Sequence, residues 1–417
     1  MKEIKRVLWF VDYELIYSGG GERLLFEGLK YFSENGIEAC LYTNGNQVKP
    51  EALFNGNYNP KVLIKEDFLG KVQKYSRWRF YSYIKGSVKP INQFQPDVII
   101  ANDLFSLMLL WKANFFGLLS IPVVCFNHGS LFQFEDDILK YALIFKSNFK
   151  NIWSSDQVYK ENISPIAPSL SFRRRLSNEL LSFIIYRSVR YAKAIFVLTL
   201  KNKLEVEALF RHKKVYNLHG AFSKALFDEK LQNDKKQTLS CSGKTVIFSL
   251  CRLEKKKKID ILIKAFALYL KSNANSVLWI GGTGLYEAEL KILVKELNLE
   301  SNVIFIGFIN DVELYDYYLS ANLFVSADNA DYDITTFVAL ALGVKAVVSS
   351  QHEFEPQLIN KLVYLANPNP EDFAKELDAS ILMDTIVTGE IRTGLLESYT
   401  WEFYFKRILN IMESISR

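Results

Sequence analysis

Arg252 and the lysine run at residues 255–258 are the side chains whose types and spacing indicate chemistry most clearly. They follow an apolar run, residues 245–250, that is typical of a buried strand. They precede apolar residues at helical spacing, residues 261–268. Cations at the carboxyl end of a parallel strand lie where open α/β sheets bind ligands, and a guanidinium fork beside ammonium groups suits a diphosphate. The same run could instead be a solvated surface cluster.

A three-glycine run and a single histidine are the next candidates. Gly19, Gly20 and Gly21 can adopt positive φ angles, so backbone amides there could approach an anion at the start of the helix expected over residues 22–32. A plain tight turn explains these glycines equally well. His128 closes an apolar run, where its side chain could reach a site at the edge of a sheet or could be purely structural.

Apolar runs of strand length alternate with helical stretches along the whole chain, which predicts an α/β fold with parallel sheets. In the first half we expect strands over residues 6–13, 38–43, 61–65, 96–101, 122–126, 194–198 and 213–218. In the second half we expect them over residues 246–250, 276–280, 302–307, 323–326, 345–349 and 362–365. The polar stretch 221–244 is typical of a linker. A chain of 417 residues suits two domains.

Composition narrows the class of protein. A hydrophobic fraction of 49% with 23% charged residues is typical of globular domains. The four cysteines include no CxxC, and with four histidines they give no metal-ligand spacing, so we expect no metal site and a reduced, cytoplasmic setting. The most apolar stretch, residues 105–126, is interrupted by Lys112, Asn114 and Pro122, which predicts a helix and a strand in place of a membrane span.

The segment SLCRLEKKKKIDILIKAF, residues 249–266, resembles the donor-site motif of the retaining family 4 (group 1) glycosyltransferases of the GT-B fold. The run VLWIGGTGLYEAELKILVKELNLESNVIFIGFINDVELYDYYLSANLFVSAD resembles that family's second domain, and QPDVIIAND and IPVVCFNHG resemble its first. The resemblance implies two Rossmann-like domains whose parallel sheets face a central cleft. It implies an acceptor-side domain over residues 1–222, a donor-binding domain over residues 223–397, and a last helix, residues 398–417, that crosses back to the first domain.

The resemblance also assigns roles to residues of the donor site. Arg252 and Lys257 fall on the two positions that hold the diphosphate of a nucleotide-diphospho-sugar, with Cys251 and Lys258 in place of the usual glycines. The glycine run at residues 19–21 would face donor phosphates or acceptor. His128 would donate a hydrogen bond to sugar or acceptor hydroxyls. The backbone after the Ile-Gly-Phe turn, at Phe308 and Ile309, would contact the base.

One departure from the family pattern concerns its pair of glutamates, which stand eight positions apart. Ala330 and Val338 occupy the two positions here, and Val338 cannot bind the ribose hydroxyls as the second glutamate does. Asp331 or Asp333 could replace the first glutamate and hold the donor sugar's hydroxyls. Either aspartate could instead cap the helix that follows.

That expected helix start offers a second anion site. The amides of Ile334, Thr335 and Thr336, with the two threonine hydroxyls, could hold a phosphate. The resemblance therefore implies a retaining glycosyltransferase that moves a sugar from a nucleotide-diphospho-sugar to a lipid-linked, membrane-held or glycan acceptor. No cofactor or metal is expected, because Arg252 and Lys257 would neutralise the diphosphate.

Two other functions remain open. Loss of both glutamates favours a catalytically silent GT-B protein that binds a glycan or a partner glycosyltransferase. A sugar-nucleotide epimerase of the same fold is the other alternative.

Basic and aromatic residues interleave in two segments of the first half, residues 71–94 and 139–190; they include Trp78, Phe80, Phe145, Phe149, Phe172 and Arg173 to Arg175. The excess of positive charge in this chain of net charge +5 also lies in the first half. Such segments suit an anionic membrane surface, which predicts a peripheral protein on the cytoplasmic membrane face. The alternative is that these aromatics line the inter-domain core, with the arginines merely solvated. We expect no nucleic-acid partner, because no helix-turn-helix, zinc or RNA-binding motif is present.

Overall fold

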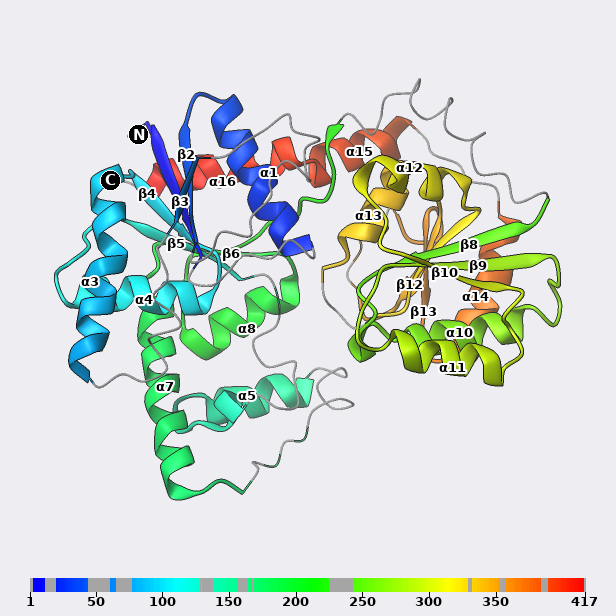
Figure 1. Ribbon diagram of the computed structural model, residues 1–417, viewed down its shortest axis with the longest axis horizontal. Coiled ribbons are helices and arrows are strands. Elements are labelled where there is room, and N and C mark those ends of the chain that lie inside the picture. Colours follow the sequence, from blue (N-terminus) through cyan, green and yellow to red (C-terminus); the bar gives the residue numbers. More distant parts are fainter. Residues whose placement is uncertain are drawn as a thin grey trace. The chain divides into compact units, whose positions relative to one another are not determined.

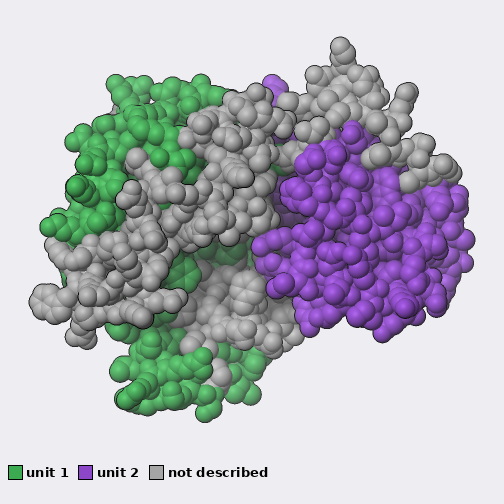
Figure 2. Space-filling view, in the orientation of Figure 1, with its two compact units in different colours: residues 1–219, 404–417 green, residues 220–403 purple. Residues whose placement is uncertain are grey.

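The computed structural model describes residues 3–11, 20–43, 61–64, 77–127, 129, 138–155, 164, 166, 169–224, 243–328, 332–352, 354, 358–383 and 389–415. The chain divides into two compact units (Figure 2): residues 1–219 with 404–417 form unit 1, and residues 220–403 form unit 2. Each unit is built on one parallel sheet (Figure 1), which confirms the expected α/β fold with two Rossmann-like domains.

Unit 1 contains a seven-stranded sheet in the order β3-β2-β1-β4-β5-β6-β7. Every adjacent pair is parallel. Its strands are β1 (Arg6–Phe10), β2 (Glu38–Thr43), β3 (Lys61–Ile64), β4 (Val98–Ala101), β5 (Val123–Asn127), β6 (Ile195–Val197) and β7 (Val215–Asn217). Its helices are α1 (Gly20–Glu34), α3 (Arg77–Phe94), α4 (Leu104–Phe115), α5 (Leu143–Ser155), α7 (Phe172–Tyr191) and α8 (Leu200–Phe210), with a 3₁₀ turn at Ile138–Tyr141.

The two faces of this sheet are covered by different helices. Side chains from α3, α4, α5, α7 and α8 join one face in a single apolar core. On the other face, Phe405 of α16 (Trp401–Ile415) stacks on Tyr31 and meets the rings of Trp9 and Phe32 edge-on. A β-carbon on Gly28 would lie 2.4 Å from Trp9 and 2.7 Å from Phe405, so α1 packs tightly there. Residues from the far end of the chain thus complete the core of unit 1.

Unit 2 contains a six-stranded parallel sheet in the order β10-β9-β8-β11-β12-β13. Its strands are β8 (Thr245–Leu250), β9 (Ser276–Gly281), β10 (Val303–Gly307), β11 (Leu323–Ser326), β12 (Ala346–Ser349) and β13 (Val363–Ala366). Its helices are α10 (Ile259–Tyr269), α11 (Glu287–Glu296), α12 (Asp311–Ser320), α13 (Ile334–Ala341), α14 (Pro370–Leu382) and α15 (Gly389–Tyr399). The strand order reverses at β8: the chain continues from β8 to β9 and β10 on one side, and β11 then pairs with the other side of β8. Open α/β sheets bind ligands at the carboxyl ends of the strands at such a reversal point.

The strands of unit 2 are buried on both faces. Helices α12, α13 and α15 cover one face, and α10, α11 and α14 cover the other. Because all six strands are parallel, their carboxyl ends lie at one edge of the sheet. The loops that follow β8, β9, β10, β11 and β12 therefore meet at that edge.

Candidate functional site

The loop after β8 carries Arg252 and the lysine run, the cations predicted from the sequence to bind a diphosphate. β8 ends at Leu250, Arg252 follows, and a short 3₁₀ turn, Lys255–Lys257, leads into α10. Lys258 joins the turn to the helix with a φ of 50° and a ψ of 35°. Lys258 therefore takes the left-handed conformation that usually favours glycine. Its position is one of the two at which the family that this segment resembles has glycine.

The lysine run divides into outward and inward side chains. Lys255 is exposed and lies 3.9 Å from Glu289, and Lys256 lies 3.5 Å from Glu254. Arg252 is half exposed and its guanidinium is 3.4 Å from Glu254. Lys257 is different, because its side chain is only 17% exposed and donates a hydrogen bond to Asp328. The surface-cluster interpretation holds for the outer lysines, and Lys257 is the member built into the sheet edge.

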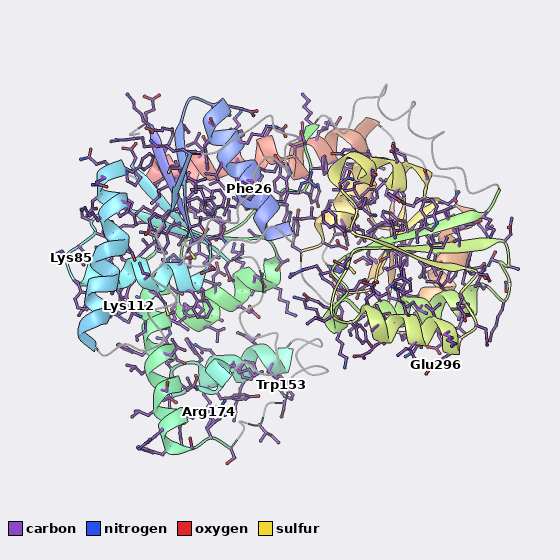
Figure 3. All side chains as sticks on the ribbon, viewed as in Figure 1. Phe26, Lys85, Lys112, Trp153, Arg174 and Glu296 are labelled. Atoms are coloured by element: carbon purple, nitrogen blue, oxygen red, sulfur yellow. The ribbon has the colours of Figure 1, made fainter. Side chains whose placement is uncertain are left out.

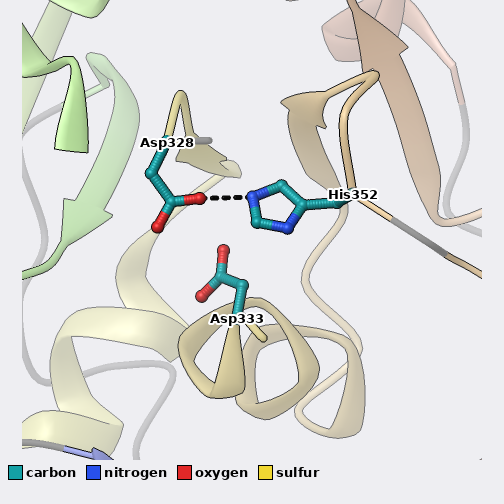
Figure 4. A group of neighbouring side chains, drawn as sticks. All are labelled: Asp328, Asp333 and His352. Atoms are coloured by element: carbon teal, nitrogen blue, oxygen red, sulfur yellow. Dashed lines mark ion pairs between the residues drawn. The ribbon is translucent and has the colours of Figure 1, made fainter. Parts of the chain in front are cut away.

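Asp328 lies two residues beyond the end of β11 and contacts two cationic groups at once. One carboxylate oxygen accepts from the ammonium of Lys257, and the other forms an ion pair with Nε2 of His352, in the loop after β12 (Figure 4). Burial opposes ionisation of Asp328, but the charges of His352 and Lys257 outweigh it and hold the pKa of this carboxyl well below its usual range. Burial would lower the pKa of His352, but the charge of Asp328 outweighs it, so this pKa is raised.

Asp333 is the N-cap of α13. Its carboxylate accepts from the hydroxyls of Thr335 and Thr336 at 2.5 and 2.6 Å, and from the Thr336 amide at 3.2 Å. The capping interpretation describes these contacts fully. Both threonine hydroxyls predicted to hold a phosphate donate to Asp333 here, while Ile334 is half-buried. Their phosphate role, and the sugar-binding role of Asp333, stay predictions.

Asp328, Asp333 and His352 could each offer one metal-ligand atom, and these atoms lie within 4.8 Å of one another (Figure 4). The contacts describe an ion-pair network instead. An ammonium group already supplies positive charge at Asp328, and the Asp333 oxygens accept three hydrogen bonds from the start of α13. The expectation that no metal is required stays a prediction.

Three loops at this edge are tied together by backbone hydrogen bonds. The Leu253 amide donates to Thr283 at 2.9 Å, the Cys251 amide donates to Gly281 at 3.2 Å, and the Gly282 amide donates to Gly307 at 2.7 Å. Gly282 has a φ of +107°, and a β-carbon there would lie 1.9 Å from the carbonyl oxygen of Cys251. The glycines after β9 are therefore needed so that the loop carrying Arg252 can lie against them.

The residues predicted to contact the base follow β10 at the same edge. Phe308 is 70% exposed, whereas Ile309 is buried with its side chain against Gly281. Val338, at the position of the second family glutamate, is buried in the apolar core beneath α13. Base contact by Phe308 and Ile309 stays a prediction.

Several predicted residues lie at the limits of what the structure describes. Gly20 and Gly21 begin helix α1, two residues before the expected helix start. Gly19, His128 and Asp331 lie outside the described residues; His128 comes directly after the last residue of β5.

Sequence reasoning missed Asp328 and His352 as members of the site. Both are polar residues just beyond the carboxyl end of a buried strand, β11 or β12. Such residues meet at one edge of a parallel sheet, so this position could have identified them.

Two family models match the chain. The model described as "Glycosyltransferase Family 4" matches residues 18–199, and the model described as "Glycosyl transferases group 1" matches residues 231–386. The chain belongs to the family 4 (group 1) glycosyltransferases. Together the two models span both units, and the group 1 match contains the loop with Arg252 and Lys257.

Curated relatives of this family 4 chain match it over part of their length. Mannosylfructose-phosphate synthase of Agrobacterium fabrum is 28% identical over 228 residues, covering 51% of this chain and 49% of that protein. A Campylobacter jejuni N-acetylgalactosaminyltransferase that acts on a diphospho-undecaprenol-linked sugar is 31% identical over 172 residues, covering 39% of this chain and 44% of that protein. The chain thus spans about half the length of the curated relatives it matches.

Solved structures resemble the family 4 chain over its whole length. The Anabaena protein HepE in complex with UDP and glucose superposes with a TM-score of 0.71 at 16% identity, covering 99% of this chain and 100% of HepE. Sucrose-phosphate synthase from Thermosynechococcus elongatus gives 0.70 at 13% identity, covering 99% of each chain. At these identities the likeness shows the fold, which is GT-B.

Proposed function

We propose that this chain is a retaining glycosyltransferase that moves a sugar from a nucleotide-diphospho-sugar to a lipid-linked or glycan acceptor. The observation that carries the proposal is Lys257, which is turned inward at the carboxyl edge of the unit 2 sheet, in the loop that also holds Arg252. The HepE structures in complex with UDP and with UDP-glucose support a nucleotide-sugar donor.

In this proposal catalysis is electrostatic. Negative charge grows on the diphosphate as its bond to the sugar breaks, and positive groups fixed in advance stabilise that charge. Lys257 supplies a charge that is already positioned by Asp328, and the half-exposed guanidinium of Arg252 can turn toward a bound diphosphate. No proton transfer to the diphosphate is needed when two cations stabilise the charge that develops on it.

Calorimetry with UDP-, GDP- and other nucleotide sugars tests the proposal. We expect one of them to bind, and Lys257→Ala to lose at least tenfold in affinity and to abolish transfer. Lys264→Ala is the matched control, because it removes a lysine that pairs with Asp260 at 3.8 Å on α10, outside the site. Equal turnover by both variants would remove Lys257 from the donor site. Retention is tested by NMR of the anomeric proton of the product.

A catalytically silent GT-B protein that binds a glycan or a partner glycosyltransferase is the second candidate. It is favoured by Val338, which is apolar and buried at the position of the second family glutamate. Absence of binding by every nucleotide sugar, in a sample that is folded, would favour this candidate over the enzyme.

We also propose that unit 1 adsorbs to an anionic membrane surface on its cytoplasmic side. The support is an apolar stripe along α7, whose members recur at helical spacing and are 81%, 60%, 61% and 53% exposed: Phe172, Leu176, Leu180 and Phe183. The exposed Arg173, Arg174 and Arg175 precede Leu176 in the first turn of α7. Figure 3 labels Arg174 on α7 and Trp153 on the neighbouring α5.

Not every predicted aromatic supports adsorption. Phe145 and Phe149 are buried in the core of unit 1, so these two side chains are not available to a membrane surface. The side chains of Trp78 and Phe80 lie outside the described residues. Within the described part of the chain, no helix has the length and apolar character needed to cross a membrane.

Co-sedimentation with vesicles tests the membrane proposal. Each arginine near an anionic leaflet contributes about 1 kcal/mol, so we expect sedimentation with phosphatidylglycerol vesicles and not with phosphatidylcholine vesicles. Phe172→Ser/Leu176→Ser should reduce it, whereas Leu285→Ser, at a fully exposed position of unit 2, should not. Equal partition onto both vesicles would contradict the proposal. A change in sedimentation coefficient caused by the α7 substitutions would assign the stripe to self-association.

A further inference from the structure

Four charged groups are gathered at the carboxyl edge of the unit 2 sheet, and only one of them is explained by donor binding. Lys257 comes from the turn after β8, Asp328 from the loop after β11, Asp333 from the start of α13 and His352 from the loop after β12. The side chains of Asp328 and His352 are 6% and 5% exposed. Figure 4 shows Asp333 beside the Asp328–His352 pair.

The network is balanced when all four groups are ionised, because two carboxylates face an ammonium and an imidazolium. Asp328 is the shared member, with Lys257 on one oxygen and His352 on the other. A folded protein is strongly destabilised when a buried carboxylate loses its only cationic partner, because an uncompensated charge is left in the interior. Asp328 is protected from that loss, because either cation can be drawn away while the other remains.

We propose that Asp328 and His352 are positioning residues for Lys257, and that a diphosphate binds to Lys257 together with a proton on His352. Asp328 fixes the ammonium at the sheet edge. When the diphosphate shares the charge of Lys257, protonated His352 remains as the counterion of Asp328. The inference rests on the proposed function, because it takes the diphosphate of the donor as the ligand of Lys257.

The sign of the coupling follows from the groups that face His352. Among the described residues these are Asp328 and Asp333, which favour the imidazolium, and Lys257, which disfavours it. Phe354, whose ring lies edge-on to the imidazole at 6.3 Å, carries no charge. A bound diphosphate adds negative charge and diverts the charge of Lys257. Both changes favour the imidazolium, so binding should draw a proton from solvent onto His352.

The first arm of the test needs no donor. NMR titration of the imidazole Cε1–H signals, with His352 assigned from His352→Gln, gives the midpoint for the wild type, Asp328→Asn and Lys257→Met. We expect Asp328→Asn to lower the His352 midpoint by at least one pH unit and Lys257→Met to raise it. His212 is the internal control, because its ring is held in unit 1 by the Ala192 carbonyl and the Lys214 amide and should titrate alike in all three proteins. An unmoved His352 midpoint in both variants would overturn the proposal.

The second arm adds inorganic pyrophosphate, which carries no base, or UDP. We expect the His352 midpoint to rise on saturation, and calorimetry in buffers of different ionisation enthalpy to show proton uptake above pH 7. Because binding takes up a proton, wild-type affinity for UDP should fall as the pH rises above 7. His352→Gln should bind UDP about tenfold more weakly than the wild type at pH 6, and its affinity should not change with pH in this way. UDP binding with an unmoved midpoint and no proton uptake overturns the inference and leaves the proposed function standing. If neither ligand nor any nucleotide sugar binds a folded sample, the proposed function fails, and the network is structural.

Discussion

Asp328 shows how single residues set the charge state of this site. Its carboxylate is buried yet ionised, because Lys257 and His352 both contact it. The raised pKa of His352 means that the folded protein binds this proton more tightly than the unfolded chain does. Its contribution to stability is therefore fully present below the unfolded pKa of about 6.5. It is lost as the pH rises through the folded pKa.

This linkage predicts how the stability lost in the His352→Gln variant depends on pH. We expect the variant to be less stable than the wild type by about 2 kcal/mol at pH 6, and the difference to shrink steadily toward pH 9, as measured by urea unfolding. The Asp328 contribution stays constant over this range, because its depressed pKa lies far below it.

His212→Gln provides the opposite control. Burial lowers the pKa of His212, so its contribution is present above about pH 6.5 and lost as the pH falls. If the two variants showed the same pH dependence, the charge assignment of His352 would be wrong.

The sequence alone identifies only part of this site. Arg252 and Lys257 could be found because a local motif carries them, and the structure places Lys257 at the sheet edge. Asp328 lies 71 positions after Lys257 in the sequence. Their contact exists only because β11 pairs with β8, and His352 joins them only because β12 pairs with β11. Neither strand pairing can be predicted from the residues around Lys257.

At the scale of elements, the loops after β8, β9 and β10 act as one support for Arg252 and Lys257. Strand positions could be predicted well, because parallel strands buried on both faces appear as continuous apolar runs. β2 and β11 have the predicted bounds, whereas β1 ends at Phe10, three residues early. The role of the glycines after β9 could not be predicted, because it depends on the backbone of a neighbouring loop.

Gly282→Ala tests this support, with Gly307→Ala as the matched control. Gly307→Ala should lower the free energy of unfolding by only about 1 kcal/mol, because its φ of +81° becomes strained while a β-carbon there meets nothing within 4 Å. Gly282→Ala should cost at least about 3 kcal/mol, because the Cys251 backbone must also move. Urea midpoints measure both, and Gly282→Ala should in addition weaken UDP binding. Equal midpoints for the two variants would contradict the loop support.

For the whole molecule, the main feature is that α16 runs from one unit into the other. Its first residues belong to unit 2 and its residues from Tyr404 onward belong to unit 1. Phe405 is fully buried against Trp9, Tyr31 and Phe32. A terminal helix that crosses back was predicted from the family resemblance and not from the helix's own residues, whose amphipathic pattern specifies an apolar face without naming its partner.

Phe405→Ala should therefore destabilise unit 1 selectively, by about 3–5 kcal/mol. In hydrogen–deuterium exchange, peptides containing β1 should lose protection while those containing β8 keep theirs. Phe373→Ala is the matched control, because Phe373 is fully buried in α14 of unit 2 and should reverse the pattern. Uniform loss of protection by either variant would show that the units unfold together.

The position of Phe405 has a consequence for synthesis on the ribosome. Unit 1 begins to emerge first, but the part of its core formed by α16 is translated only after the whole of unit 2. Nascent chains usually fold domain by domain from the N-terminus. Here Trp9 and Phe32 lack the cover of Phe405 until residues 404–415 leave the exit tunnel, so the unit that is made first is the last to be completed.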